Sequence, residues 1–238
     1  MSHGWEGVVL KLFRGKDFQF TVTGAEDVTP TYRRVDFADG GLLAAAGVHP
    51  AMWVRLWFDL DSNPHQRAFT LVDPDAEAGT FSIEFALHGG SASKWAEAAA
   101  PGDTIDATLQ GTRFHDPDPA PSRLCIVGDA ASAPAVNSLL DHFDRTEAVI
   151  WFETQHEEDR DLPLRVEDGR HEVRWIDRGD TGEALVKQVR TDLPDLFSED
   201  AYLWITCEAK STRQIASFAK KELGIPKQRI HALGYWRA

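Results

Sequence analysis

The sequence predicts a two-domain protein, in which an amino-terminal antiparallel β-barrel is followed by an α/β domain with a mostly parallel sheet. Three observations predict this fold class. Short strand-like stretches fill the first half, a proline-rich segment (HDPDPAPSR) follows at 115–123, and strands alternate with helices after it. We therefore assign residues 1–114 to the barrel, 115–123 to a linker and 124–238 to the α/β domain.

The predicted barrel strands are stretches of β-branched and aromatic residues bounded by Gly, Pro and Asp. They cover residues 5–13, 31–37, 52–60, 67–72, 80–88 and 104–109. Asp73-Pro74-Asp75 suits a tight turn, so we expect 67–72 and 80–88 to form a hairpin. Residues 91–100 (SASKWAEAAA) are rich in alanine and begin with serines suited to an N-cap, which predicts a short helix.

The second domain alternates between apolar strand-like stretches and helical periodicity. The predicted strands cover 124–127, 148–153, 173–176, 201–207 and 230–236, and the predicted helices cover 132–143, 183–193 and 212–223. This alternation is typical of parallel βαβ units. Cys125 lies inside an apolar strand, where a thiol serves as a small core side chain.

Composition and charge exclude several classes of protein. The 25 basic and 38 acidic side chains give a net charge of −13, which argues against a general nucleic-acid binder because phosphate contacts need clustered Lys and Arg. No apolar run approaches the ~20 residues of a membrane span, and the first residues lack the basic start and apolar core of a signal peptide. Two cysteines are too few for a disulfide framework. We therefore expect a soluble cytoplasmic protein, with a monomer as the default.

The charge is distributed unevenly along the chain. Residues 201–238 carry seven basic and two acidic side chains, whereas 112–200 carry 10 and 21. We expect the basic residues from Lys210 to Lys227 to form the solvated face of the last helix.

Arg67-Ala68-Phe69-Thr70 is the first stretch whose side chains could bind a ligand. Arginine offers a planar fork for a phosphate, an aromatic ring stacks on a flat heterocycle, and threonine can bond a ring nitrogen. Alternation along a strand would place Arg67 and Phe69 on one face. An edge arginine beside a core phenylalanine is the structural alternative.

Two turns between a strand and a helix are further candidates. After His88, Gly89-Gly90 and a serine-capped helix would expose backbone amides to a pyrophosphate, although an ordinary capped helix would look the same. Gly128-Asp129 follows a strand of the α/β domain, where ligands bind in open sheets. This second turn lacks the GxGxxG spacing of a dinucleotide fingerprint.

Six stretches in order carry a family resemblance: Arg67–Thr70 (RAFT), Phe85–Gly89 (FALHG), Ser91–Ala96 (SASKWA), Pro101–Asp103 (PGD), Gly128–Ala135 (GDAASAPA) and Gly234–Arg237 (GYWR). They are similar to motifs of the siderophore-interacting proteins, FAD-containing ferric-siderophore reductases of the ferredoxin–NADP⁺ reductase-like group. The resemblance implies a flavin-binding barrel followed by a Rossmann-like domain of the NAD(P)H-binding kind.

The resemblance also implies roles for individual residues. Phe69 would lie against the isoalloxazine of FAD, Thr70 would bond its polar edge, and Arg67 would hold the phosphate or ribityl chain. The residues implied at the pyrophosphate and adenosine are His88, Gly89, Ala92, Ser93 and Trp95, and those implied to border the flavin from the second domain are Asp129, Ser132, Tyr235 and Trp236. Three departures from the family pattern are Phe69 for Tyr, Ser91 for Pro, and Ala130-Ala131 for Glu-Thr.

The function that the resemblance implies is reduction of a ferric siderophore from Fe(III) to Fe(II), with electrons from NADH, NADPH or ferredoxin. The flavin carries this chemistry, so we assign no catalytic side chain and expect no metal site in the protein. An anionic ferric chelate needs local cations on a chain of charge −13, and the candidates are Arg55, Arg113 and Arg237. Each could also be an ordinary solvated arginine.

Two other functions stay open. One is a related flavin-dependent reductase whose acceptor is ferredoxin, free flavin or another small oxidant. The other is a siderophore-binding protein without redox activity, which the Ala130-Ala131 departure suggests. The electron donor is also open because residues 124–238 contain no recognisable nucleotide fingerprint.

Overall fold

The computed structural model describes residues 16–60, 63–110 and 113–238. The chain consists of two compact units, residues 1–114 and 115–238. The strand predicted at 5–13 lies outside the described residues.

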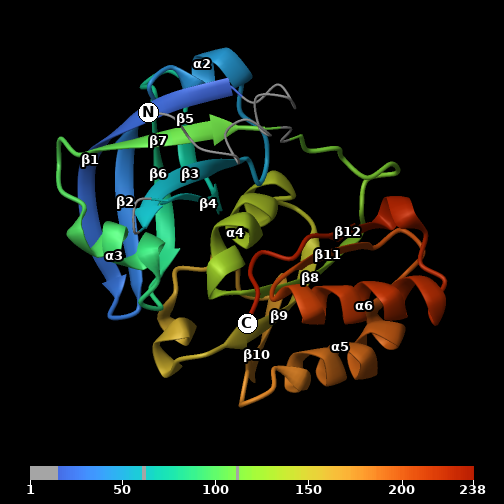
Figure 1. The fold of residues 1–238 in the computed structure, drawn as a ribbon. Helices are drawn as coiled ribbons and strands as arrows, with labels where there is room; N and C mark the ends of the chain where they lie inside the picture. The colour runs from blue at the N-terminus through green and yellow to red at the C-terminus, as the bar shows by residue number, and fades with distance from the viewer. Residues whose placement is uncertain (1–15, 61–62, 111–112) are drawn as a thin grey trace. The chain divides into compact units, whose positions relative to one another are not determined.

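The first unit is built on one antiparallel sheet. Its strands are β1 (Lys16–Thr29), β2 (Tyr32–Ala38), β3 (Trp53–Leu60), β4 (Asn63–Thr70), β5 (Val72–Asp75), β6 (Thr80–Ala86) and β7 (Thr104–Leu109), joined by helices α2 (Leu42–Ala46) and α3 (Ser91–Ala98). The seven strands lie in the order β4-β3-β7-β1-β2-β6-β5 and curl into a partial barrel (Figure 1). This arrangement confirms the predicted antiparallel barrel-like fold.

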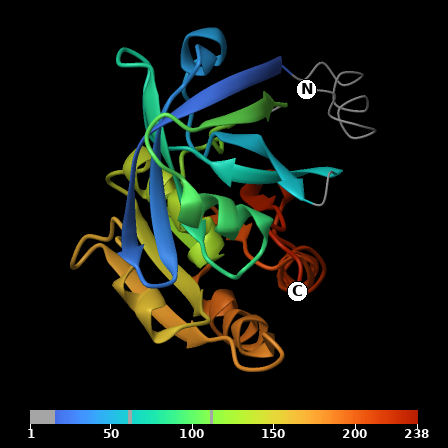
Figure 2. The ribbon, with the colours of Figure 1, turned by 60° about the vertical axis from the view of Figure 1, so that its left-hand side comes forward.

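The curl of this sheet encloses the core of the first unit (Figure 2). On β1, Phe20 and Val22 are buried while Gln19 and Thr21 are exposed, as the two-residue period of a strand requires. The ring of Phe20 meets that of Phe81 edge to face, with 4.9 Å between their centroids.

The sequence analysis did not predict β1, although it spans 14 residues. Its alternation of apolar and polar residues breaks after Val22, where the register against β2 shifts, and Glu26 and Asp27 follow on exposed positions. A regular hydrophobic period is the main signal for a strand, so an irregular strand escapes it. The short helix α2 was also missed.

The predicted hairpin of 67–72 with 80–88 is wrong in its first strand. β4 ends at Thr70 and pairs with β3, whereas the short strand β5 pairs with β6. The turn falls at 76–79, where the Oδ1 atom of Asp75 accepts hydrogen bonds from two backbone N–H groups and Gly79 takes a φ of 65°. Pro74 fits inside β5 because β5 is an edge strand.

The second unit is an α/β fold. Its strands are β8 (Arg123–Asp129), β9 (Glu147–Thr154), β10 (His171–Asp177), β11 (Tyr202–Thr206) and β12 (Ile230–Ala232), and its helices are α4 (Ala133–His142), α5 (Glu183–Leu196) and α6 (Ala209–Lys221). The strands are parallel in the order β10-β9-β8-β11-β12, which confirms the predicted parallel sheet. The chain reverses its direction across the sheet between β8 and β11, and ligands bind at such switch points.

Helices cover both faces of this sheet. α5 and α6 bury Leu185, Leu193 and Ile215 against the strand face that carries Cys125. α4 lies on the opposite face, where a Cβ atom at Gly128 would come within 3.1 Å of the Val136 side chain. Gly128 therefore permits the close approach of strand and helix.

The end of the chain differs from its prediction. The strand expected at 230–236 is shorter, because β12 stops at Ala232 and Trp236 forms an isolated parallel bridge with Glu208. Between them, a Cβ atom at Gly234 would lie 2.8 Å from the backbone of Ala209, so this position needs glycine. The helix expected at 212–223 begins three residues earlier, at Ala209.

Both cysteines are free and buried. Burial raises the pKa of the Cys125 thiol to about 12, as befits a core side chain. Residues 115–123 contain neither helix nor strand beyond the first residue of β8, and the carbonyl of Pro119 accepts a hydrogen bond of 2.7 Å from Arg229. Within the described parts of the chain, no helix is long and apolar enough to cross a membrane.

Candidate functional site

In the first unit, β4 presents the candidate flavin residues on its two faces. Phe69 pairs with Val54 and Arg67 pairs with Leu56 on β3. Paired side chains share a face, so Phe69 and Arg67 lie on the face that carries the core. Phe69 is half-buried, with its ring centroid 4.6 Å from that of Phe85, whereas Arg67 is exposed. Thr70, on the other face, is buried.

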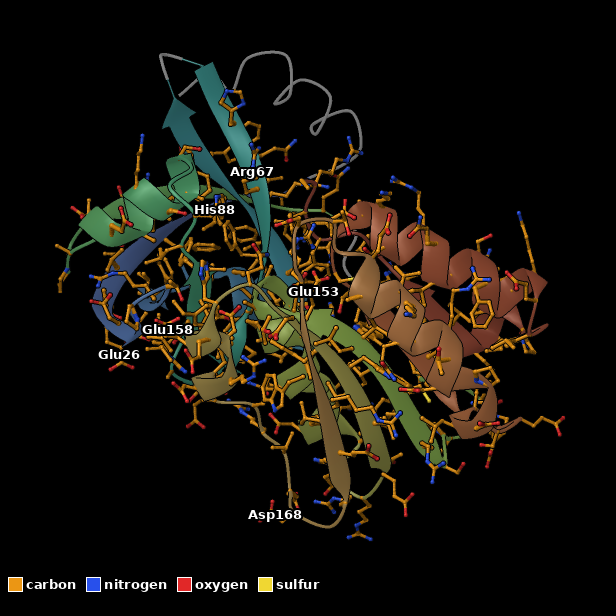
Figure 3. All side chains as sticks on the ribbon, turned by 90° about the horizontal axis from the view of Figure 1, so that it is seen from below. Glu26, Arg67, His88, Glu153, Glu158 and Asp168 are labelled. Atoms are coloured by element: carbon orange, nitrogen blue, oxygen red, sulfur yellow. The ribbon has the colours of Figure 1, made fainter. Side chains whose placement is uncertain are left out.

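The turn after β6 leads directly into α3. His88, labelled in Figure 3, follows β6. It donates its backbone N–H to the Oγ atom of Ser93 at 3.0 Å, which closes the turn through Gly89, whose φ is 76°. Gly90, rather than a serine, occupies the N-cap, so the N-cap residue offers no side-chain acceptor to the first turn of α3. The serine cap that the sequence predicted is therefore wrong.

This uncapped helix start fits a pyrophosphate. The first N–H groups of a helix have no acceptor within the helix, and the helix dipole adds positive potential there. Strand β4 contributes Arg67, whose guanidinium donates a hydrogen bond to the carbonyl of its neighbour Gln66. The donors therefore suit two phosphates, and the half-buried ring of Phe69 suits a flat heterocycle, so the residues present fit FAD.

Two other predicted cofactor residues belong to the packed core. Ala92 is buried, and the ring of Trp95 lies almost parallel to that of Phe37 with 6.2 Å between centroids. Trp95 also meets Phe58 edge to face at 6.0 Å. These contacts fix the orientation of α3 on the sheet.

The three predicted substrate arginines lie in different settings. Arg55 on β3 shares a face with Ala68, opposite to the face of Arg67, and its guanidinium lies 5.1 Å from the ring centroid of Trp53. Arg113 is exposed and follows β7. Arg237 is exposed at the end of the second unit.

In the second unit, the structure brings three of the predicted residues together. The side chains of Asp129 and Ser132 bond each other's backbone N–H groups in the short helical turn η1 (Ala130–Ser132). Trp236 donates its Nε1–H to the Oδ2 atom of Asp129 at 2.7 Å. Tyr235 is held by its backbone N–H, which donates to the carbonyl of Cys207 at 2.9 Å.

The sequence analysis missed two residues of this cluster, Glu153 and Arg178. Glu153 pairs with Asp129 across β8 and β9 and is fully buried at the carboxyl end of its strand. In Figure 3, the label of Asp168 marks the opposite end of the sheet from Glu153. Arg178 follows β10 and binds the Oε2 atom of Glu153 at 2.5 Å. Its guanidinium also lies 4.6 Å from the ring centroid of Trp236.

Two buried carboxyl groups thus lie side by side, and one of them, Glu153, is paired with the half-buried guanidinium of Arg178. Burial raises the pKa of Asp129 to about 7, and the hydrogen bond from Trp236 only partly opposes this shift, while the charge of Glu153 adds to it. Burial also raises the pKa of Glu153, against the attraction of Arg178. The Oε1 atom of Glu153 is buried and has no hydrogen-bond partner among the described residues. The cluster therefore holds a proton near neutral pH.

Glu208 is a third residue that the sequence analysis missed. Its backbone forms the isolated bridge with Trp236 of the carboxyl-terminal segment. Its carboxylate caps α6 by accepting the N–H groups of Lys210 and Ser211 at 2.6 and 2.9 Å. Burial opposes its ionisation, but these donors outweigh burial and hold the pKa of Glu208 below its ordinary value. The only sequence signal for Glu153 and Glu208 was an acidic residue at the end of an apolar strand.

Two family models match most of the chain. Residues 48–111 match the siderophore-interacting FAD-binding domain, and residues 121–238 match the siderophore-interacting protein model. The first match contains β3 through α3, and the second contains the cluster around Asp129.

Curated relatives match the whole chain but are much longer. The mycobactin import ATP-binding/permease protein IrtA of Mycobacterium tuberculosis is 31% identical over 245 residues, covering 100% of this chain and 28% of that protein. The IrtA protein of Mycolicibacterium smegmatis is 32% identical, covering 99% of this chain and 28% of that protein. The chain therefore spans about 28% of the length of these relatives.

Solved structures share the fold at low sequence identity. The siderophore-interacting protein of Acinetobacter baumannii has a TM-score of 0.81 at 19% identity, covering 93% of this chain and 91% of that chain. A siderophore utilization protein from T. fusca has a TM-score of 0.79 at 21% identity, covering 94% and 93%. The ferredoxin–NADP⁺ reductase of Plasmodium falciparum has a TM-score of 0.70 at 12% identity, covering 92% and 97%.

Proposed function

Because the chain belongs to the siderophore-interacting protein family, we propose that it reduces ferric siderophores from Fe(III) to Fe(II) with bound FAD and electrons from NADH, NADPH or ferredoxin. One observation carries this proposal. The segment that matches the FAD-binding domain contains a helix start without a side-chain cap, directly after the Gly89-Gly90 turn. After the reduction, the chelator would bind Fe(II) more weakly than it bound Fe(III), and the metal would be released.

In this proposal, the residues of the first unit bind and orient the cofactor. The first-turn N–H groups of α3 and the guanidinium of Arg67 bind the pyrophosphate, and Ser93 keeps the turn closed through its bond to His88. Phe69 offers a ring face to the isoalloxazine. Bound FAD supplies the redox chemistry by accepting two electrons from a donor and passing them on singly.

Arg55, Arg113 and Arg237 are proposed to attract and orient the anionic chelate. Their local positive charge offsets the net charge of −13, which otherwise repels an anion. Arg237 is well suited because its neighbour Trp236 is fixed on both sides: the carbonyl of Trp236 accepts the N–H of Ala209 at 2.9 Å, and its indole bonds Asp129.

The redox step is tested on purified protein loaded with FAD. We expect flavin absorption, bleaching by NADH, NADPH or reduced ferredoxin without oxygen, and rapid reoxidation when a ferric siderophore is added, with Fe(II) trapped by ferrozine. Failure to take up FAD would overturn the proposal. Reoxidation by ferredoxin or free flavin alone would indicate a reductase with another acceptor. Flavin that the siderophore does not reoxidise would indicate a binding protein without redox activity.

The substrate arginines are tested by charge removal. We expect Arg55→Ala and Arg237→Ala each to raise the KM for an anionic ferric chelate about tenfold, the loss of one charge-assisted contact, with the flavin spectrum unchanged. Arg237→Lys should retain part of the affinity. Arg145→Ala, an exposed arginine after α4, is the matched control and should leave KM unchanged. Equal KM values in all variants would remove this assignment.

A further inference from the structure

The parallel sheet of the second unit has one long edge strand, β10 (Figure 1). Among the described residues, β10 pairs only with β9, over seven residues and without a register shift. Proteins usually shorten, bulge or interrupt an edge strand, because its unpaired backbone groups attract another strand. The strand at the other edge, β12, has only three residues. β10 has no proline and no bulge, so its outer side is an open edge.

Two hydrogen bonds at the ends of β10 show which backbone groups lie on its open side. The carbonyl of Arg170 and the N–H of Arg178, which flank the strand, both bond residues of β9. Backbone groups alternate between the two sides of a strand, so the odd-numbered residues of β10 turn theirs away from β9. Among the described residues, the N–H and C=O groups of Val173 and Trp175 have no hydrogen-bond partner. They are therefore available to a further strand.

Charged side chains are another common protection of an edge strand, but those at the centre of β10 have opposite signs. The Nε atom of Arg174 donates to the Oε1 atom of Glu172 at 2.7 Å, and its Nη1 atom donates to Asp192 at 2.5 Å. Among the described residues, the Nη2 atom of Arg174 and the Oε2 atom of Glu172 have no hydrogen-bond partner. Each side chain can thus bind one more opposite charge.

These two charges select a single register for a second β10 strand. Two copies related by a two-fold axis pair antiparallel, so the residue on the axis defines the register. With Val173 on the axis, Glu172 of each copy lies directly opposite Arg174 of the other. With either charged residue on the axis, like charges lie opposite each other, which is destabilising. With Trp175 on the axis, Arg174 lies opposite Ile176 and gains no charged partner. We call the first arrangement the Val173 register.

The free backbone groups match in the Val173 register as well. Each copy donates the N–H of Val173 to the carbonyl of Val173 in the other copy, and the N–H of Trp175 to the carbonyl of His171. The N–H of His171 keeps its own bond to the carbonyl of Glu167 at 3.0 Å. The half-buried side chains of Val173 and Trp175 lose further contact with water, which adds a hydrophobic contribution.

We propose that β10 is the docking strand for a second copy of this chain, which adds antiparallel to it in the Val173 register. The product is a two-fold symmetric dimer in which the parallel sheets of both copies join into one. This inference is independent of the proposed function, and it replaces the monomer that was the default expectation. Pairing of two short strands buries less surface than a standard interface, so we expect a reversible dimer with a Kd above about 1 μM.

The first test measures the average mass of the full chain by analytical ultracentrifugation, from about 1 to about 200 μM protein. We expect the mass to rise from that of one chain towards that of two. Glu172→Lys places a second cation opposite Arg174 and should weaken the Kd tenfold or more. The matched control is Glu199→Lys, the same charge change at an exposed residue before β11, which β8 and β9 separate from β10. It should change the Kd less than twofold.

The second test addresses the register by exchanging charges between copies. Arg174→Glu alone places two carboxylates opposite each other and should also weaken the dimer tenfold or more. A mixture of Glu172→Lys with Arg174→Glu restores both opposite-charge pairs. The mixture should therefore associate at least tenfold more tightly than either variant alone.

A proline variant tests the open edge without any change of charge. The N–H of Val173 lies on the open side, so Val173→Pro should keep the pairing with β9 while it removes the central donor of the dimer. We expect the Kd to weaken at least tenfold. This variant also keeps the inference testable if Arg174→Glu, which loses the contact with Asp192, fails to fold.

Three results would overturn the inference, and none of them bears on flavin binding or iron reduction. The first is a mass of one chain at every concentration. The second is equal weakening by Glu172→Lys and Glu199→Lys, which would indicate a general charge effect. The third is a dimer of Val173→Pro as tight as that of the unmodified chain, which would assign the contact to another surface.

Discussion

At the scale of single residues, Asp129 is the group whose charge state matters most. It lies at the carboxyl end of β8, only 1% exposed, with Glu153 beside it and the indole of Trp236 as its donor. A carboxyl with a pKa of about 7 changes charge near neutral pH, unlike an ordinary aspartate with a pKa of about 3.9. The Trp236 contact is therefore coupled to a proton.

This coupling predicts the pH dependence of stability. Between about pH 4 and 7, Asp129 is protonated in the folded state and ionised in the unfolded state, so raising the pH favours unfolding by up to about 1.4 kcal/mol per pH unit. We expect Asp129→Asn, which keeps an acceptor for Trp236, to remove this slope. Urea unfolding at pH 5, 6, 7 and 8 measures it. The control Asp168→Asn, an exposed loop residue, should follow the unmodified protein, and an unchanged slope in Asp129→Asn would contradict the assignment.

The sequence indicated part of this cluster and could not indicate the rest. Asp129 and Trp236 were proposed because they lie in motifs that resemble a family. Glu153 and Arg178 lie outside those motifs. Glu153 lies beside Asp129, and Arg178 pairs with Glu153, only because the strand order places β9 between β8 and β10. A strand pattern predicts that a parallel sheet forms, but neighbours in the sheet follow from long-range packing, which a local pattern does not contain.

At the scale of secondary-structure elements, prediction succeeded where the hydrophobic period is regular. β3, β7 and β9 have nearly the predicted bounds because β-branched and aromatic residues fill them. It failed where backbone conformation overrides the pattern, as within β5, where Asp73 has a φ of 48° and the register against β6 shifts between Val72 and Asp75. The start of α3 differs for a related reason, because Gly90 replaces the expected serine cap.

The turn before α3 gives a prediction with a matched pair of glycines. Gly89 and Gly169 have φ values of 76° and 80°, and a Cβ atom at either would meet no atom within 4 Å. Ala at either position should therefore cost a similar 1–2 kcal/mol of stability, from backbone strain alone. We expect only Gly89→Ala to weaken FAD binding, by roughly tenfold, because the strained turn moves the first amides of α3. Flavin fluorescence titration measures this, and equal FAD affinity in the two variants would show that the turn does not hold the pyrophosphate.

At the scale of the whole molecule, each of the two units has hydrophobic core residues of its own among the described residues. Residues between Phe20 and Ala107 form a core in the first unit, and residues between Cys125 and Ile225 form one beneath α5 and α6 in the second. The charge is divided as well, since Lys210, Arg213, Lys220 and Lys221 on the exposed face of α6 belong to a chain of net charge −13. Net charge therefore describes the average surface, whereas attraction of an anionic partner depends on the local distribution of exposed cations.

Because each unit has core residues of its own, we expect bound FAD to stabilise mainly the unit that binds it. A ligand at 100 times its Kd stabilises the part that it binds by about 2.7 kcal/mol, and amides protected by that part exchange about 100-fold more slowly. We expect FAD to slow hydrogen exchange by this factor in β3, β6 and β7, and to leave β9 and β10 within about twofold. The amide of Tyr235, bonded to Cys207, reports separately on the carboxyl-terminal segment, and slower exchange there would support its proposed place beside the flavin. Equal slowing in β7 and β9 would mean that the two cores unfold as one.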